Sequence, residues 1–599
     1  MLTEYITLGV YLAVLLALGA YFKKFTNNLS DFVRGGAQGR WWLIGTSILM
    51  SAISAFTFTG NASAAFEGGP SLLVIYIANC AGFACGGLFL GRWMRQTRAY
   101  TSADVVRKRF GVPVEQFNAY FGVVMYPITA AIQLYALSLF ASTVLGLPLI
   151  PILITIAIIV TFYSTSGGKW AVMATDFVQA MVMISITLLV CFLSLRAIGG
   201  FSEFFSYFKD PRFAEDFKFI KDAGTFDGDR YTLKWAIVIF FIQVNAQISL
   251  SSAGRYITAR DGKEAAKASW LGFALMAIGS AVWFIPPMIA RFLFEAEILG
   301  SGIDKPAESA YAYIAMELLP NGLLGMMIAA MFAATMSSMD TGLNSQVGMI
   351  ARNIIPRIRT MLGREHALSP KQEMRICHIA TVCLGILITL YAMFFVFYDE
   401  VTLFDVSLMI AAVIGVPLSF PLFLGLWLRK LPKWSFFPIF AACTIPSLYT
   451  FIDSKFFGNP WTVQDKAMWI MTFGIAAGLI CRLLAKHSSQ QSTVELEAFF
   501  EEMDRPINYQ EEIGESAIDY EQYFIIAKAL FFVGALITLI LLLPNDFFNR
   551  LCVLFIAGFV FTIGALLWWG GTRAKAIVQK NQSTQKQAVA DNEAATLKP

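Results

Sequence analysis

The sequence has few charged residues for its length. Asp, Glu, Lys and Arg make up 14% of its 599 residues, whereas 57% are hydrophobic, and the mean hydropathy is +0.62. Soluble globular domains have about 25% charged residues, so this composition excludes an ordinary soluble protein. The net charge of +4 is too small to indicate a nucleic-acid partner.

Histidine and cysteine are also scarce. There are 3 histidines, and His366 and His378 fall at a predicted loop and helix end with no acid–base constellation around them. The 8 cysteines lie mostly in apolar segments and show neither metal-ligand spacing nor a secreted disulfide pattern. We therefore expect a protein that is not an enzyme, and the sequence indicates no obligate protein partner.

Long apolar runs, in contrast, are abundant. A membrane-spanning helix needs about 20 mainly apolar residues. The first run, Tyr5 to Phe22, has no basic residue before it and no cleavage site after it, which predicts a retained helix and not a signal peptide. About fifteen spans are predicted, near residues 4–24, 41–66, 70–95, 115–145, 148–165, 172–198, 231–254, 265–294, 308–351, 374–397, 402–428, 435–453, 464–485, 521–543 and 549–570.

The loops between these spans alternate in charge. One side collects basic clusters, namely Lys23 to Arg40, Arg95 to Arg109, Arg255 to Lys267, Arg352 to Arg375, Arg429 to Lys433, and Arg573 with Lys575. The other side holds the acidic segment 200–230. Because cytoplasmic loops carry the excess of Lys and Arg, we expect an inner (plasma) membrane protein with its N-terminus outside and its C-terminus in the cytoplasm.

Polar and small residues interrupt two of the spans at mid-membrane depth. The first cluster runs from Gly45 to Asn61, and the second runs from Gln243 to Gly254. One interpretation is that the hydroxyls bond to carbonyls four residues earlier and that the small residues permit close helix packing. The other is a pair of broken helices, which mark transporter binding sites. The clusters fall on the second and seventh spans in opposite orientations, as an inverted five-plus-five repeat requires, and this favours broken helices.

Polar atoms also gather in the ninth span, between Ala333 and Ser345. Sodium is a hard cation that needs several oxygen ligands. Two hydroxyls, of Ser337 and Ser338, and the Ala334 carbonyl would supply three of them, with an unwound helix supplying the rest. Asp340 and Asp176 are predicted to be buried acids without an obvious lysine partner, which indicates a bound cation or a shared proton.

Three short motifs carry a resemblance to a known family. They are Gly-Gly-x-x-Ala-Val-x-x-Thr-Asp-x-x-Gln ending at Gln179, Ala-x-x-Ser-Ser-x-x-x-x-x-Asn-Ser from Ala334 to Ser345, and Tyr100-Thr-Ser-Ala-Asp with Arg109-Phe-Gly. Over roughly residues 4–430 the chain resembles the sodium:solute symporter family, which includes bacterial galactose, proline and sialic acid carriers. The resemblance implies sodium-coupled import of a small polar organic solute across the lipid bilayer by alternating access.

The same resemblance implies the fold, an all-α polytopic membrane protein with a leucine-transporter-like inverted repeat. One extra helix precedes the repeat and several follow it. The expected segments are an N-terminal helix and loop (1–40), the first repeat (41–198), an outside loop (199–230), the second repeat (231–430), further helices (431–485), an acidic cytoplasmic linker with a short surface helix (486–520), two last helices (521–570) and a disordered tail (571–599).

Residue by residue, the resemblance also implies where ions bind. The main sodium site falls on the carbonyls of Met50, Ile53 and Ala334 and the hydroxyls of Ser337 and Ser338. A second sodium or proton site falls on Asp176, Ser337, Asp340 and Thr341. Asp340 stands where the family has a hydroxyl, so it either strengthens a second sodium site or makes that site sensitive to protons.

The solute pocket is implied less specifically. Its candidate residues are Ser54, Phe56, Thr57, Tyr76, Asn79, Gln133, Asn245 and Gln247. The galactose carriers' glutamate and glutamine align with Phe56 and Thr57, so a galactose-type site is not preserved. The sialic acid carriers' arginine aligns near Gln133, and a neutral amide cannot replace bidentate carboxylate binding. We therefore expect a neutral or zwitterionic polar solute.

Three other functions fit parts of the pattern. A proton-coupled symporter would use the same fold with a different coupling ion. A symporter-like membrane sensor would need a cytoplasmic output domain, and the segment from His487 to Tyr520 is too short to form one. A channel is disfavoured because the polar clusters predict broken helices and not a continuous charged pore ring.

Overall fold

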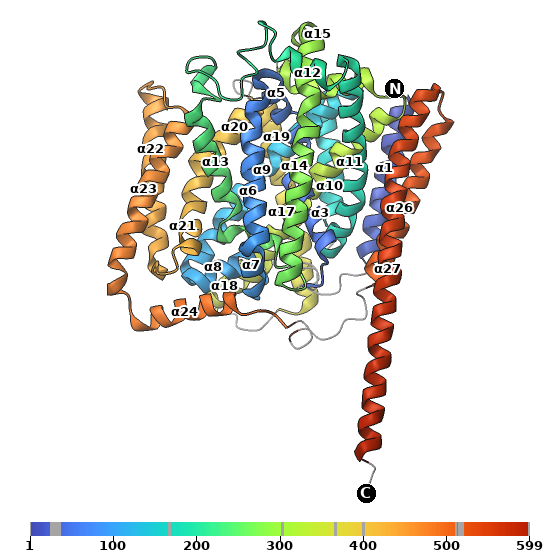
Figure 1. Ribbon diagram of the computed structural model, residues 1–599. Helices are drawn as coiled ribbons and strands as arrows, with labels where there is room; N and C mark the ends of the chain where they lie inside the picture. The colour runs from blue at the N-terminus through green and yellow to red at the C-terminus, as the bar shows by residue number, and fades with distance from the viewer. Residues whose placement is uncertain are drawn as a thin grey trace.

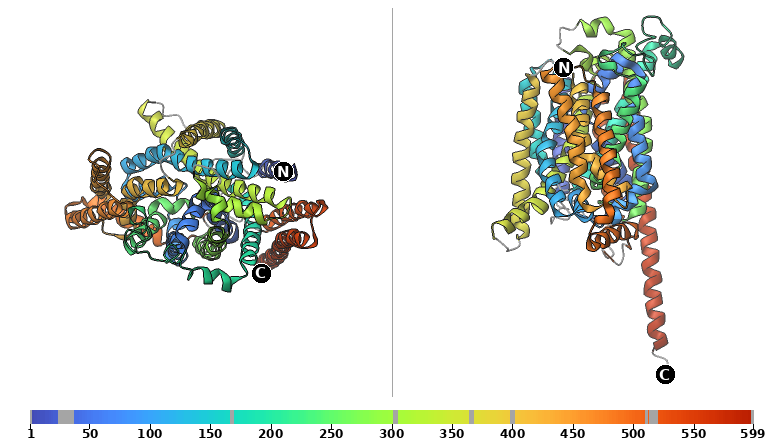
Figure 2. Two further views of the ribbon diagram at one scale, coloured as in Figure 1. Left: turned by 90° about the horizontal axis from the view of Figure 1, so that it is seen from above. Right: turned by 90° about the vertical axis from the view of Figure 1, so that its left-hand side faces the viewer.

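A computed structural model shows a bundle of closely packed, near-parallel helices (Figure 1). It describes residues 2–23, 37–165, 169–300, 305–363, 368–397, 402–508, 512 and 520–596. Viewed from above, the bundle is elongated, with the α22–α23 pair and the α26–α27 pair near its two ends (Figure 2). No β-strand is present among the residues that the structure describes.

The helices differ widely in length. Those of eight or more residues are α1 (Leu2–Lys23), α3 (Trp41–Ala52), α5 (Gly60–Gly68), α6 (Leu73–Cys85), α8 (Ser102–Phe110), α9 (Val112–Leu145), α10 (Leu149–Ser164), α11 (Lys169–Ile198), α13 (Leu233–Gln247), α14 (Gly262–Leu293), α16 (Ala310–Leu318), α17 (Leu323–Met349), α19 (Pro370–Val396), α20 (Leu403–Ile410), α21 (Val416–Trp427), α22 (Phe436–Phe456), α23 (Val463–Leu483), α24 (Gln490–Asp504), α26 (Glu521–Thr538) and α27 (Phe547–Thr596). Shorter helices are α4 (Ala55–Phe58), α7 (Gly91–Gln96), α12 (Phe201–Tyr207), α15 (Glu295–Leu299) and α18 (Ile355–Met361), together with the 3-10 helix η5 (Leu250–Arg255).

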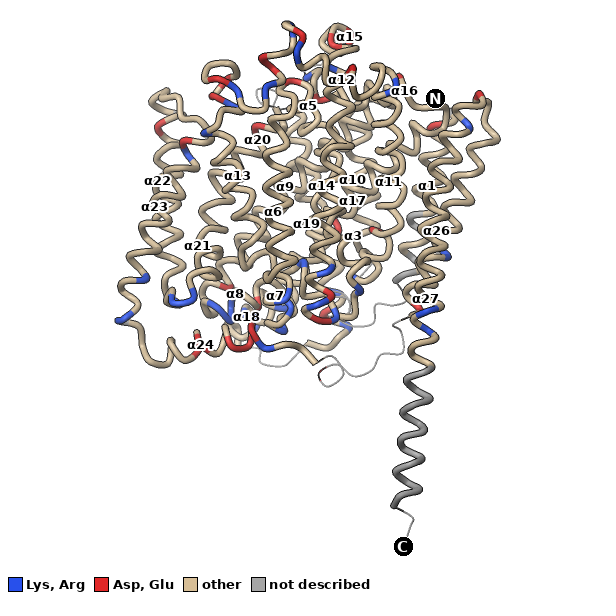
Figure 3. The backbone as a smooth tube through the Cα atoms, in the orientation of Figure 1, with Lys and Arg blue, Asp and Glu red and all other residues tan. Residues whose placement is uncertain are grey.

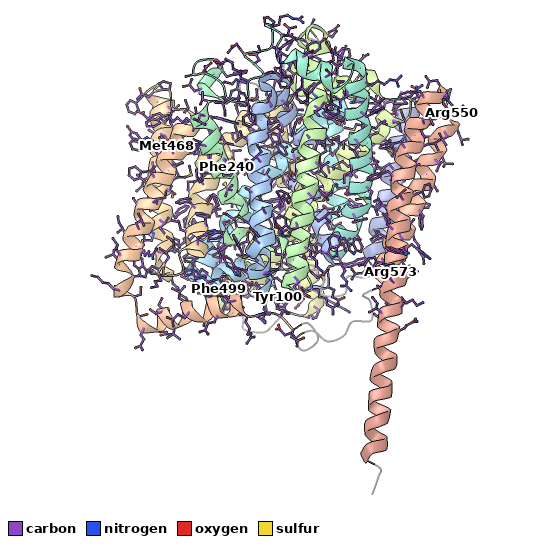
Figure 4. All side chains as sticks on the ribbon, viewed as in Figure 1. Tyr100, Phe240, Met468, Phe499, Arg550 and Arg573 are labelled. Carbon is purple, nitrogen blue, oxygen red and sulfur yellow. The ribbon has the colours of Figure 1, made fainter. Side chains whose placement is uncertain are left out.

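Many of these helices are long and apolar enough to cross a membrane. Eleven qualify among the described residues, and four shorter apolar helices accompany them. On α27, Arg550 lies at one end of the bundle and Arg573 at the level of the other (Figure 4). The 23 residues between these two arginines rise about 34 Å, close to the thickness of a bilayer's hydrocarbon core. The chain is therefore a multi-pass membrane protein.

The two ends of the bundle differ in charge. Lys and Arg gather at the end that carries α8, α18 and α24, which we call the basic end (Figure 3). There α24 lies across the bundle, and its acidic side chains pair with basic ones, Glu502 with Lys108 at 2.8 Å and Asp504 with Arg429 at 2.7 Å. The chain begins near the opposite end and finishes beyond the basic end (Figure 1).

Two expectations differ from the structure. The ninth span, expected over 308–351, is divided, because α16 ends at Leu318 and α17 starts only at Leu323. Pro320 and Gly322, the latter with φ of +85°, make the turn between them. In place of a disordered tail from residue 571, α27 continues to Thr596, since this stretch is rich in Ala, Gln and Lys and has no Gly or Pro after Gly571.

Candidate functional site

The second span is broken between α3 and α4. Ile53 (φ −124°, ψ 152°) and Ser54 (φ −155°, ψ −176°) are both extended. In an unbroken helix the Met50 carbonyl would accept from the Ser54 N–H, and the Ile53 carbonyl from the Thr57 N–H. Here the Ser54 N–H donates to Thr57 Oγ1, and the Thr57 N–H donates to the Ser54 carbonyl. The break therefore releases the Met50 and Ile53 carbonyls from their helical partners.

Both interpretations of the hydroxyls in this span are correct, for different residues. Thr46, Ser51 and Thr59 donate to carbonyls four residues earlier. Ser54 instead caps α4, with its Oγ accepting from the Phe56 N–H. The Ser47 hydroxyl bonds to another helix, α11, and donates to Asp176 Oδ2 at 2.5 Å. The prediction of a broken helix is confirmed.

The seventh span is broken as well. Helix α13 ends at Gln247, Ser249 is extended (φ −103°, ψ 169°), and the chain continues as η5. The Gln247 amide donates to Asn79 Oδ1 at 2.8 Å and accepts from Arg255. The bond with Arg255 joins the two sides of the second break, and the bond with Asn79 holds the end of α13 against α6.

Helix α17 is bonded to both sides of the first break. The Ala55 N–H donates to Thr335 Oγ1 at 2.9 Å, and the Ser51 and Thr341 hydroxyl oxygens lie 3.2 Å apart, within hydrogen-bond distance. Ser337 and Ser338 lie between these two bonds along α17, so they are held against the segment that contains Met50 and Ile53. The predicted main sodium-binding residues are thus brought together from two elements.

The two serines differ in their partners. Ser338 Oγ donates to Gln133 Oε1 at 2.8 Å and to the Thr335 carbonyl at 2.9 Å. The Ser337 hydroxyl is buried and makes no hydrogen bond within the described residues, although it lies near enough to interact with Asp176. A buried hydroxyl without a partner is costly. Beside released carbonyls it fits a hard cation such as sodium, and no cluster of three His, Cys, Asp or Glu that could hold another metal is found in the described part of the chain.

The candidate second site contains a lysine. Asp176 and Asp340 are both buried, and Asp340 accepts a hydrogen bond from Ser164. The expectation that these acids have no lysine nearby is wrong. Lys169, the first residue of α11, is near enough to both carboxylates to interact with them electrostatically, although it forms no ion pair with either among the described residues. Its Nζ also lies 3.4 Å from Thr341 Oγ1. The pairing depends on how α11 packs against α17, which the sequence does not show.

A cavity of about 450 Å³ lies between the broken helices, α9, α17 and α21. Its wall includes Gln133 and Ser338 at one end and Ser102 and Met349, beside α8, at the other. The cavity therefore extends from the candidate sodium site toward the basic end. Further lining residues are Ser47, Ser51, Tyr126, Lys169, Ser251, Ser252, Arg255, Thr341 and Ser419.

Of the eight predicted solute-binding residues, Gln133 lines this cavity and the others do not. Ser54, Thr57, Tyr76, Asn245 and Gln247 are buried, and Phe56 and Asn79 are partly buried. Asn245 Nδ2 donates to Ser419 Oγ at 2.5 Å and so lies behind the wall. The Tyr76 hydroxyl accepts from Asn61 at 2.8 Å.

Buried aromatic rings close the side of the breaks away from the cavity. Phe58 packs against Trp283 and Tyr311, with ring centroids 6.1 and 5.0 Å apart. Tyr76 packs against Trp283 and Phe284 at 6.3 and 4.7 Å. The structure is thus open on the basic side of the site and packed on the other.

Several polar residues of the cavity wall were missed from the sequence, among them Arg255, Lys169 and Ser419. Arg255 was assigned to a charged loop, but it is in η5 and reaches Gln247. Its position directly after the polar cluster that ends at Gly254 is a signal that could have revealed it. Ser419 carries no comparable signal, because it is a single polar residue in an apolar stretch. Lys169 directly follows the polar segment Ser164-Thr-Ser-Gly-Gly, so the sequence alone places it in a loop and not in the cavity wall.

Gly82 permits the close approach of α6 and α13 at the second break. A Cβ at this position would lie 2.4 Å from the Gln247 Cβ. We expect Gly82→Ala to lower stability by ~1–3 kcal/mol through overpacking, seen as a lower melting temperature of the purified protein. Gly558→Ala is the matched control, because a Cβ there meets nothing within 4 Å. Equal melting temperatures for the two variants would contradict this packing.

Comparisons with known proteins agree with this geometry. The sodium:solute symporter family model matches residues 32–434. The sodium/sialic acid symporter SiaT of Proteus mirabilis is 24% identical over 443 residues, covering 71% of this chain and 85% of the symporter. Sodium/glucose cotransporter 1 of Ovis aries is 24% identical over 399 residues, covering 58% and 57%. A solved sodium-coupled sialic acid symporter in a substrate-bound, outward-open state superimposes with a TM-score of 0.68 at 20% identity, covering 81% of this chain and 98% of that one.

The broken helices and the oxygen-rich site between them define an all-helical membrane transporter of the leucine-transporter type. The chain belongs to the sodium:solute symporter family. It is therefore a sodium-coupled symporter that moves a small solute across a membrane, and not an enzyme.

Proposed function

We propose that this symporter imports a small, neutral or zwitterionic polar solute into the cell, with the basic end in the cytoplasm. The orientation is supported by the Lys and Arg residues at that end (Figure 3) and by the positive-inside rule. It places the N-terminus outside and the C-terminus in the cytoplasm of a plasma (inner) membrane protein. The cavity then opens inward, in the state from which solute is released.

We propose that sodium is held by the carbonyls of Met50, Ile53 and Ala334 and the hydroxyls of Ser337 and Ser338. One observation carries this proposal. The Met50 and Ile53 carbonyls have lost their helical partners at the first break, and α17, which is bonded to both sides of that break, carries the buried Ser337 hydroxyl without a hydrogen bond in the described residues. The oxygens belong to different elements, so converging on one cation would hold the first break against α17. The sodium gradient supplies the drive, about 2.3 kcal/mol per charge per 100 mV plus the concentration term.

The solute class is inferred from the polar groups near the breaks. Gln133 and Ser419 line the cavity and are neutral. The wall also holds two cations, but Arg255 bonds Gln247 and Lys169 lies near the two buried acids. The other predicted residues would complete the pocket when the opposite side opens, namely Ser54, Phe56, Thr57, Tyr76, Asn79, Asn245 and Gln247. The matching relatives include sialic acid and glucose carriers. Gln133 stands near the position of the sialic acid carriers' arginine, so we propose a solute without a net negative charge.

A thermal-shift screen of the purified protein tests this function. Sugars, polyols, amino acids, nucleosides and carboxylates are each added in sodium and in potassium buffer. A ligand of the folded state raises apparent stability, so we expect one neutral or zwitterionic class to stabilise the protein only in sodium. Stabilisation only by carboxylates would contradict the proposed solute class, and stabilisation that ignores sodium would contradict the proposed site.

Gln133 links the solute pocket to the sodium site through Ser338. We expect Gln133→Ala to raise the KM for the solute roughly tenfold, because one hydrogen bond in the pocket is lost. Uptake kinetics at saturating sodium measure this effect. Thr129→Ala, an exposed position on the same helix, is the control. A KM equal to that of the control would exclude Gln133 from the pocket.

A further inference from the structure

Three charged side chains are buried together beside the proposed sodium site. Lys169, Asp176 and Asp340 have exposed fractions of 7%, 1% and 2%. Each carboxylate is held by a hydroxyl from a different helix, Asp176 by Ser47 and Asp340 by Ser164. Ionisable groups inside a membrane are costly and mark functional positions.

The lysine lies beside the candidate second ion site. Its ammonium group interacts electrostatically with both carboxylates and lies 3.4 Å from the Thr341 hydroxyl. Thr341 also bonds Ser51 beside the first break. One predicted ligand of a second sodium ion, the Thr341 hydroxyl, thus already faces a cation that is covalently attached to α11.

We propose that the Lys169 ammonium group takes the place of a second sodium ion, so that this transporter binds one sodium ion per chain. This inference rests on the proposed function, because it assumes that the one sodium ion binds at the main site proposed above. Lys169 is then the residue that sets the ion stoichiometry.

The charge of the cluster supports a single ion. In their ordinary charge states the two carboxylates and the lysine sum to −1, and one sodium ion at the main site brings the buried sum to zero. A second sodium ion would leave an uncompensated positive charge in a low-dielectric interior, which is strongly unfavourable. It would also lie against the ammonium group, where like charges repel.

Counting bound sodium tests the inference without knowledge of the solute. Radioactive sodium is titrated onto the purified protein, and bound ions per chain and the Hill slope are measured. We expect one ion and a slope near 1 for wild type, and the same for Lys169→Arg, which keeps the charge. We expect Lys169→Met to bind two ions with a slope approaching 2, because the vacated place between Asp176, Asp340 and Thr341 admits a second ion.

The outcomes separate the two proposals. Two sodium ions on wild type, or one ion at unchanged affinity on Lys169→Met, would overturn the role of Lys169 and leave the symporter function intact. No sodium binding at all to wild type would overturn the proposed sodium site itself. Should Lys169→Met fail to fold, the wild-type count decides alone, because one ion per chain supports the inference and two ions overturn it.

Discussion

Replacing Ser337 with alanine is expected to raise the sodium concentration needed for half-maximal uptake by ~10- to 100-fold. The Ser337 hydroxyl is buried, has no hydrogen-bond partner in the described residues and lies between α17 and the first break. We therefore propose that it contacts the ion, beside the Asp176 carboxylate. A hydrogen bond to a charged group contributes about 1.5–3 kcal/mol, which we take as the scale for one lost ion ligand and convert to this change in affinity.

The matched control is Ser194→Ala. Ser194 is a buried serine whose hydroxyl bonds only within its own helix, to the Val190 carbonyl. Sodium activation of uptake is measured for both variants, together with the melting temperature. A Ser337→Ala protein that folds and is activated by sodium like the control would show that Ser337 is not a ligand.

The second large effect is expected for Asp176→Asn. This carboxylate accepts from Ser47 on α3, interacts with Ser337 on α17 and balances Lys169 on its own helix. Asparagine keeps the shape but removes the charge that Ser47 bonds and that lies near Lys169, and a hydrogen bond to a charged group contributes about 1.5–3 kcal/mol. We expect sodium affinity to fall more than tenfold and the melting temperature to fall as well.

Thr187→Ala controls for the loss of a buried polar group in α11. The Thr187 hydroxyl donates to the Met183 carbonyl, three turns away from Asp176. Sodium titration and thermal unfolding are compared across wild type and the two variants. If the folded Asp176→Asn protein binds sodium with wild-type affinity, Asp176 does not contribute to ion binding.

Much of the fold follows from patterns within single segments. The apolar runs predict the helices, and the two polar clusters predict the breaks after Ala52 and Gln247. Backbone groups without helical partners persist inside a membrane only where polar groups of the protein or a water-filled cavity satisfy them. The divided ninth span was missed, although Pro320 and Gly322 are an ordinary turn signal.

The candidate ion site was only half predictable. Ser337 and Ser338 stand out as adjacent hydroxyls in an apolar helix, so composition alone locates them. Lys169 does not stand out, because its proximity to Asp340 arises from packing between helices 171 positions apart in the chain. Gln133 was named, but its bond to Ser338 is likewise a tertiary contact.

The solute-binding residues were the least predictable. Most of them are buried here, Tyr76 against Trp283 and Phe284 and Asn245 against Ser419. A transporter exposes these positions in only some of its states. A sequence shows which residues are polar but not in which state each one reaches the solute.

Reconstitution into proteoliposomes tests the central claim most directly. Uptake of the solute found by the thermal-shift screen is measured under an inward sodium gradient, an inward potassium gradient and a proton gradient. We predict accumulation above equilibrium with sodium alone, and its loss in Ser337→Ala at low sodium. Equal accumulation with the potassium gradient, or accumulation driven by protons without sodium, would contradict sodium coupling at the proposed site.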